Sequence, residues 1–138
     1  MSVQRYHVDS NILLRFLTGE PAEMFAAASG FIASAERGEV LLELSPLVLA
    51  ETAFTLESFY QQPRKAVAAT LLEFVKRSGV RLAERERLVD ALERVQKTGI
   101  HLVDAYLAAS AAESKLAVAS FDRDLDKFQD VTRFEPKG

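Results

Sequence analysis

The 138-residue chain contains no cysteine and only two histidines, His7 and His101. The absence of cysteine excludes a disulfide framework and any chemistry that needs a thiolate. Two histidines are too few for a histidine-rich zinc site. A metal ion bound by this chain would therefore be held mainly by oxygen ligands.

Hydrophobic targeting and membrane segments are also missing. The first ten residues mix charged and apolar side chains and lack the hydrophobic stretch of a signal peptide. No run approaches the roughly 18 apolar residues of a membrane span. With 49% hydrophobic and 27% charged residues, the composition is that of a globular protein and not of a disordered chain. We therefore expect a soluble cytoplasmic protein with no membrane partner, folded as a single domain over residues 1–138.

Charge is distributed unevenly, although the net charge is only −3. Between Arg64 and Lys97, nine Lys or Arg side chains accompany five acids, whereas the rest of the chain has eight basic and fifteen acidic residues. A basic region beside an acidic body can contact a phosphate backbone. Solvated helix faces explain the same pattern equally well, so composition leaves both explanations open.

Strand-like segments alternate with helical ones along the chain. The expected strands are residues 3–8, 40–44, 80–82, 117–120 and 131–134, and helices are expected at about 12–17, 21–37, 46–60, 63–78, 84–97, 102–116 and 124–128. This alternation predicts an α/β fold with a mostly parallel sheet flanked by helices on both faces. Ligands of such sheets bind at the carboxyl ends of the strands, and site residues are expected there.

Two acids follow strands directly. Asp9 comes after the first strand, and Asp122 comes after the strand at 117–120. Both side chains are therefore expected at the same end of the sheet. Helix capping is the ordinary explanation for a single acid at such a position, but two acids at equivalent strand ends weaken it.

Two further acids interrupt apolar stretches of helices. Glu51 has mostly apolar neighbours one turn away, and a buried acid needs a partner or a metal. A salt bridge to an arginine is the competing explanation, and Glu57 on the same helix is expected to be solvated. Asp104 also interrupts an apolar face, with stabilisation of the helix dipole as the competing explanation. His101, one turn before Asp104, is expected to be structural, with contact to the substrate as the alternative.

These four acids come from four elements that a fold of this class can bring to one end of the sheet. Two carboxylates about 4 Å apart repel by roughly 4 kcal/mol at an effective dielectric constant near 20, so a cluster needs cations or protons. Mg²⁺ and Mn²⁺ prefer carboxylate and water oxygens. We therefore predict a Mg²⁺ or Mn²⁺ site for phosphodiester chemistry, in which metal-bound water attacks phosphorus.

The motifs that carry these acids are similar to those of a known family. VDSNILLRFL, Glu51 in SPLVLAETAF, Asp104 in HLVDAYLAASA and Asp122 in VASFDRDLDKF resemble the PIN-domain family, in particular the VapC-type toxins of toxin–antitoxin pairs. Each motif alone is weak. The ordered set of four is specific, and it spans essentially the whole chain.

The resemblance implies one five-stranded sheet of order 3-2-1-4-5, a homodimer, and a small antitoxin protein whose peptide arm blocks the active site. It implies catalytic and metal-binding roles for Asp9, Glu51, Asp104 and Asp122. Asp124 or Asp126 would supplement or replace Asp122, and the sequence does not decide between them. Ser10 and Asn11 correspond to the polar pair after the first acid, where hydrogen bonds are expected to hold Asp9 in place.

The resulting hypothesis is a Mg²⁺- or Mn²⁺-dependent endoribonuclease, the toxin of a type II toxin–antitoxin system, with metal-activated water and no protein nucleophile. Arg15 and the region from Arg64 to Lys97 are candidates for RNA contact. One alternative is a PIN-like binding module that has lost turnover. Another is a response-regulator-like phosphoacceptor domain, but such domains pair two acids after the first strand, and here Ser10 follows Asp9.

Overall fold

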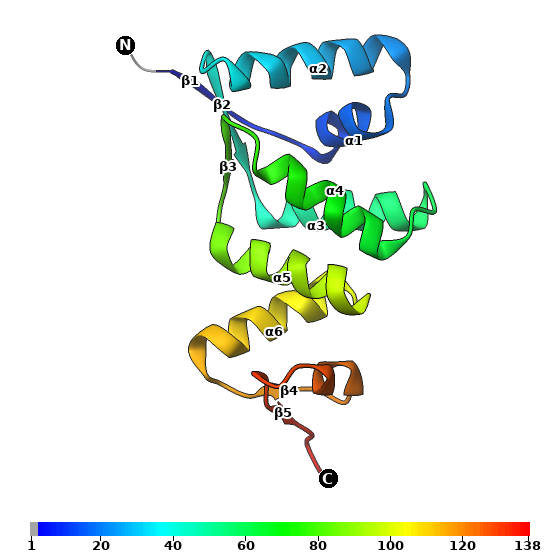
Figure 1. Ribbon diagram of the computed structural model, residues 1–138, viewed down its shortest axis with the longest axis vertical. Helices are drawn as coiled ribbons and strands as arrows, with labels where there is room; N and C mark the ends of the chain where they lie inside the picture. The colour runs from blue at the N-terminus through cyan, green and yellow to red at the C-terminus, as the bar shows by residue number, and fades with distance from the viewer. Residues whose placement is uncertain (1–2) are drawn as a thin grey trace.

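Helices and short strands alternate along the chain, as the sequence predicted (Figure 1). The computed structural model describes residues 3–138, so the first two residues of the predicted domain lie outside the described part. The strands are β1 (Gln4–His7), β2 (Val40–Leu44), β3 (Val80–Leu82), β4 (Val118–Ala119) and β5 (Arg133–Phe134). The helices are α1 (Ser10–Thr18), α2 (Ala22–Glu36), α3 (Pro46–Ser58), α4 (Arg64–Val75), α5 (Arg85–Thr98) and α6 (Leu102–Ser114), followed by a short 3₁₀-helix (Arg123–Lys127). None of the described helices is both long and apolar enough to cross a membrane.

Short polar side chains begin two of the helices that carry candidate residues. Asp9 precedes α1, and its Oδ1 accepts a hydrogen bond from the Ile12 N–H at 3.2 Å. Ser45 precedes α3, and its Oγ accepts from the Val48 N–H at 3.1 Å. These oxygens satisfy N–H groups that have no partner inside the helix. The starts of α1 and α3 are therefore set by the local sequence.

The strands form two separate parallel sheets. β1, β2 and β3 pair in that order, with Tyr6 opposite Leu42 and Leu42 opposite Val80. β4 pairs with β5, with Val118 opposite Arg133. The predicted single five-stranded sheet of order 3-2-1-4-5 is therefore wrong: its two halves, 3-2-1 and 4-5, are present, but β1 and β4 are not paired in the described chain.

A small second core accounts for the separate position of β4 and β5. Ala108 and Ala111 of α6 pack with the buried side chains of Val118 and Leu125. Burying a side chain such as leucine contributes about 1.5–3 kcal/mol, whereas a strand of two residues offers few hydrogen bonds worth about 1 kcal/mol each. α6 packs along α5 (Figure 1). The segment after α6 folds back onto α6 and forms the second core there.

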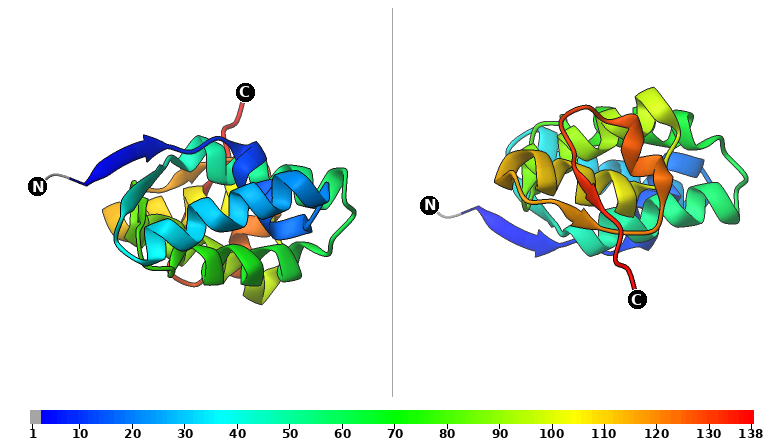
Figure 2. Two further views of the ribbon diagram at one scale, coloured as in Figure 1. Left: turned by 90° about the horizontal axis from the view of Figure 1, so that it is seen from above. Right: turned by 90° about the horizontal axis from the view of Figure 1, so that it is seen from below.

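The three-stranded sheet has one buried face. Leu42 and Val80 point to this face and are buried. The opposite face carries Arg5, which pairs with Glu43, and the exposed Arg81. All four residues of β1 are exposed, and this strand lies at the periphery in both views of Figure 2. The prediction of helices on both faces is therefore wrong for this sheet, because charged side chains occupy its second face.

An apolar core joins the sheet to the helices. Leu13 of α1, Leu49 and Leu56 of α3 and Leu71 of α4 are completely buried within it. Each contributes roughly 1.5–3 kcal/mol by burial. This packing fixes the positions of α1, α3 and α4 relative to one another.

Arg94 fastens the C-terminal segment to α5. Its guanidinium pairs with Asp90 at 2.9 Å and with Asp130 at 2.6 Å, and it lies over the Phe128 ring, 4.9 Å from the ring centroid. Only 10% of the Arg94 side chain is exposed. The hydrogen bond to Asp130, reinforced by Asp90, raises the pKa of Arg94 above its usual range. The positions of Asp90, Asp130 and the Phe128 ring therefore depend on the buried Arg94 guanidinium.

Replacing Arg94 with alanine should lower the free energy of unfolding by about 1–3 kcal/mol, because two carboxylates lose their partner and Phe128 loses its cover. Urea denaturation at neutral pH measures this change. Arg37→Ala is the matched control, since the pair of Arg37 and Glu39 is more than half exposed and its loss should lower the free energy of unfolding less than the loss of Arg94 does. Equal effects of the two substitutions would contradict the role given to Arg94.

Removal of the cap on α1 should also be measurable. Asp9→Ala should destabilise the fold by about 1 kcal/mol, whereas Asp9→Asn keeps a capping oxygen and should change stability little. Thermal denaturation without divalent ions tests this difference. Similar unfolding of the two variants would show that the hydrogen bond to Ile12 does not stabilise α1.

Candidate active site

Asp9 and Glu51 line one hollow, formed where α1 and α3 approach each other. Its volume is about 510 Å³. Both acids are exposed to solvent. Between them lies Ser10, only 9% exposed, whose Oγ donates a hydrogen bond to Glu51 Oε1 at 2.5 Å. Ser10 therefore orients Glu51, whereas the sequence predicted that it would hold Asp9.

Asn11 and Arg15 line the same hollow. Asn11 is exposed, and Arg15 is half-buried. Arg15 donates from Nη1 to the carbonyl oxygen of Glu20 at 3.0 Å. A guanidinium has five N–H donors, so Arg15 keeps donors for a further partner beside the acids.

Asp104 belongs to a second acidic group, with Asp122 and Asp124. Asp104 lies in the first turn of α6 and is half-buried. Burial raises the pKa of its carboxyl, and the charges of Asp122 and Asp124 raise it further, against the opposing influence of His101 and Arg64. These acids from α6 and from the segment after β4 are therefore close enough to repel one another.

The three acids of the segment after β4 have different surroundings. Asp122 begins the 3₁₀-helix by accepting a hydrogen bond from the Asp124 N–H at 2.9 Å. Asp124 lies 3.5 Å from Lys127 Nζ. Asp126 pairs with Arg133 at 3.0 Å, and that hydrogen bond lowers the pKa of Asp126. Asp122 and Asp124 are thus the acids whose charges act on α6, while Asp126 is held by its own arginine.

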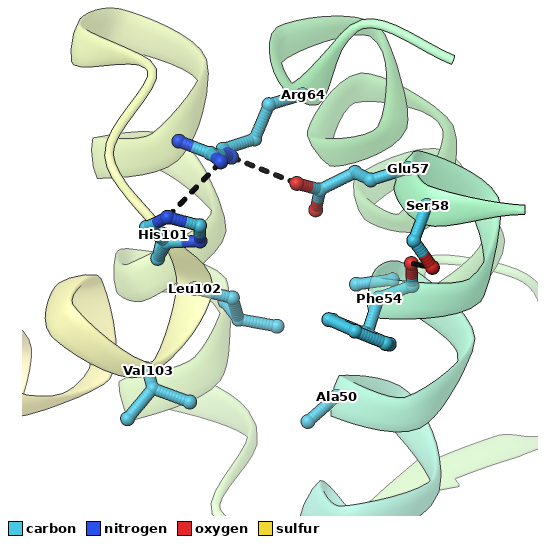
Figure 3. Close-up of a pocket in the computed structure, with 9 residues that line it drawn as sticks. Ala50, Phe54, Glu57, Ser58, Arg64, His101, Leu102 and Val103 are labelled. Atoms are coloured by element: carbon cyan, nitrogen blue, oxygen red, sulfur yellow. Dashed lines mark hydrogen bonds and ion pairs between the residues drawn. The ribbon is translucent and has the colours of Figure 1, made fainter. Parts of the chain in front are cut away.

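Arg64, at the start of α4, connects α3 to the turn before α6 (Figure 3). Its Nε donates to Glu57 Oε1 at 2.7 Å, and its Nη1 donates to the carbonyl oxygen of Gly99 at 2.6 Å. Its Nη2 lies 3.2 Å from His101 Nε2. One side chain therefore holds the beginning of α6 against α3.

The two acidic groups lie on facing helices and do not merge. α3, which carries Glu51, and α6, which carries Asp104, face each other across a cavity (Figure 3). Within residues 3–138, however, no three Asp, Glu or His side chains are close enough together to hold one metal ion. The structure thus places Asp9 with Glu51, and Asp104 with Asp122, as two separate groups.

The chemistry of both groups fits a hard divalent cation. Carboxylate oxygens are the ligands that Mg²⁺ and Mn²⁺ prefer. Asp9 and Glu51 each use one oxygen in a hydrogen bond within the described chain, which leaves the second oxygen of each for another ligand. The pKa of Asp104 is raised first by burial and then by the charges of Asp122 and Asp124, against the opposing charges of His101 and Arg64. A cation nearby would add to these opposing charges.

The sequence misjudged burial along α3. It predicts apolar surroundings for Glu51, but Glu51 is exposed, as are Leu47 and Phe54 one turn away, at 83% and 70%. It predicts that Glu57 is solvated, but Glu57 is half-buried and paired with Arg64. The two residues of this pair are on different helices, so no helical spacing in the sequence indicated it.

The basic region from Arg64 to Lys97 is not a free cationic surface. Four of its arginines form ion pairs with acids of the same chain: Arg64 with Glu57, Arg77 with Glu36, Arg87 with Glu84 and Glu113, and Arg94 with Asp90 and Asp130. Much of the local positive charge is therefore neutralised within the fold.

Asp104→Asn should reduce the pH dependence of stability in EDTA. The pKa of Asp104 in the folded chain lies above the ordinary value of 3.8, so the folded state binds this proton more tightly than the unfolded state does. Stability therefore falls as the pH rises from the ordinary pKa through the raised one. Because Asp104 is only partly buried, the effect should stay below about 1 kcal/mol. Thermal unfolding between pH 4 and pH 7 measures it.

Asp126→Asn is the control with the opposite sign. The pKa of Asp126 is lowered from 3.8 by Arg133, so its contribution to stability is present above that value and is lost as the pH falls below it, and the unfolding measurements are extended below pH 4 for this variant. A change of the pH profile in the same direction for both variants would contradict the surroundings described for these two acids.

Comparison with known proteins assigns the chain to a family. A family model described as PIN domain matches residues 6–131. The matched range contains the second half of β1, the whole of β2 and β3, and all the acids described above. A comparison with curated proteins gives no match. Because the family model covers most of its length, the chain belongs to the PIN-domain family.

Proposed function

We propose that the chain is a metal-dependent endoribonuclease that hydrolyses RNA phosphodiester bonds with water as the nucleophile. PIN domains are generally nucleases. The observation that carries the proposal is the hollow between α1 and α3, which Asp9 and Glu51 line and where Ser10 orients Glu51. Nearby, burial and the charges of Asp122 and Asp124 raise the pKa of Asp104. Perturbed carboxylates of this kind occur preferentially at functional sites. Cations relieve their repulsion.

Asp9 with Glu51, and Asp104 with Asp122, would hold Mg²⁺ or Mn²⁺ as two neighbouring groups, with Asp124 close to Asp122 as a supplementary acid. When bound, such an ion stabilises negative charge on phosphate oxygens and lowers the pKa of water. The cation and the substrate would attract the acids of both groups, which lie on facing helices, and both groups would then act on one substrate.

Glu51 is the acid best prepared to accept a proton from the attacking water. The hydrogen bond from Ser10 to Glu51 Oε1 fixes the carboxylate and leaves Oε2 as the acceptor. Asp9 is fixed in the same way, because its Oδ1 caps α1. Orientation before substrate binding lowers the entropic part of the barrier. Arg15, which lines the same hollow, would contact the RNA backbone.

We further propose that this ribonuclease is the toxin of a type II toxin–antitoxin pair, that it forms a homodimer, and that a small antitoxin protein inhibits it. The motifs around the four acids, which resemble those of VapC-type toxins, support this role. Leu47 and Phe59, near the two ends of α3, are 83% and 75% exposed. Exposed apolar side chains of this size are typical of protein-binding surfaces.

Asp9→Asn should reduce cleavage of single-stranded RNA with Mn²⁺ by about 100-fold or more, because the amide keeps the cap on α1 but removes a charged ligand. Asp104→Asn should behave in the same way. Initial rates on a labelled RNA measure both variants. Glu39→Gln is the control, since Glu39 is an exposed partner of Arg37 and lines neither the hollow of Asp9 and Glu51 nor the cavity beside Arg64.

Folded Asp9→Asn and Asp104→Asn variants that cut as fast as the parent would contradict the proposed site. If the parent binds Mn²⁺ in calorimetry but does not cut RNA, the outcome favours a PIN-like binding module without turnover.

A further inference from the structure

A second cavity lies between α3 and the start of α6, beside the acidic groups. Its volume is about 310 Å³, within the range of small-ligand sites. Phe54 and Ala50 line it from α3, and Leu102 and Val103 line it from α6 (Figure 3). The Phe54 ring extends from α3 toward Leu102. One wall of the cavity is therefore an aromatic face.

The opposite end of this cavity is polar. Glu57, Arg64 and His101 meet there through the hydrogen bonds that hold α6 against α3. The Arg64 guanidinium makes three contacts through its five N–H groups, and Glu57 uses one of its two carboxylate oxygens. Donors and an acceptor therefore remain at this end. Because Glu57 balances the charge of Arg64, the cavity is not built for a free anion.

This cavity is adjacent to the acids in the chain and in space. Phe54 lies one helical turn after Glu51 on α3, and Val103 directly precedes Asp104 on α6. The charges of Arg64 and His101 act on the Asp104 carboxyl. A group bound in the cavity would therefore be a near neighbour of a phosphate held by the acids.

We propose that this cavity binds one unpaired nucleobase of the RNA, which stacks on Phe54 and directs its hydrogen-bonding groups toward Glu57 and Arg64. The proposal rests on the ribonuclease function proposed above and adds that the substrate is single-stranded at this position. A nucleobase has a flat apolar face and a rim that carries both donors and acceptors. The aromatic wall of the cavity matches the flat face of a base, and its polar end matches the rim. Phe54 is 70% exposed, so its ring is available for stacking without rearrangement of the core.

The chain contains no tryptophan, so Phe54→Trp introduces a single indole fluorophore at the cavity. Titration with a six-residue oligoadenylate in EDTA, where metal-dependent cleavage is blocked, should quench its fluorescence. An abasic strand of the same length should not quench it, because it has a backbone but no bases to stack. Phe134→Trp is the matched control: Phe134 is exposed on β5 and does not line the cavity, so its fluorescence should change little.

The affinity of the protein for the oligoadenylate gives a second measurement. Phe54→Ala should weaken binding of the oligoadenylate by about 5- to 150-fold, the loss expected for one base–aromatic stack, and Phe54→Tyr should keep most of the affinity. Circular dichroism establishes that each variant is folded. Because the ring is largely exposed, the alanine variant is expected to fold.

Equal quenching by the oligoadenylate and the abasic strand, or no quenching at millimolar strand, would overturn the proposal. A fluorescence change of Phe54→Trp that follows protein concentration without RNA, together with dimerisation in sedimentation, would also overturn it and assign this face to protein contact. Base-dependent quenching in a protein that never cuts RNA would keep the subsite and reject the ribonuclease. Cleavage by Phe54→Ala at the parent's rate and affinity would reject the subsite alone.

Discussion

The three contacts of Arg64 help to determine how the two acidic groups face each other. The apolar core includes residues of α3, α4 and the first turns of α6, among them Leu102 and Ala105, and hydrogen bonds from one guanidinium to Glu57, Gly99 and His101 add to this packing at the start of α6. Asp104 follows this junction in the first turn of α6. The spacing between α3 and α6, and with it the possible cooperation of their acids, therefore depends on a side chain outside both groups.

Charge is used in two opposite ways within this small domain. At Arg94 and Arg133, cations pair with acids at 3.0 Å or less and lower the pKa values of Asp130 and Asp126, which stabilises the fold at neutral pH. At Asp104, burial and like charge have the reverse effect. The C-terminal segment is thus held in place by acids that pair with arginines, whereas Asp104 on α6 lies near other acids.

Local signals in the sequence were sufficient for the order of the elements and for the start of the site. The sequence predicted that the first strand ends directly before Asp9 and that a helix begins at residue 46, and in the structure α1 follows Asp9 and α3 begins at Pro46. Contacts between distant segments were not readable. The packing of Leu125 against α6 separates β4 from β1, the pairing of Glu57 with Arg64 crosses two helices, and Ser10 turns toward Glu51. None of these contacts has a periodic signature.

β1 is an edge strand of the larger sheet. All four of its residues are exposed, and Arg5 and His7 are among them. The unpaired backbone groups of an edge strand can pair with strands from other molecules, and long, flat, apolar edge strands do so most readily. A short edge strand that carries a cation resists this assembly. The polar side chains of β1, which have no part in the acidic groups, therefore help to keep the chain from aggregating.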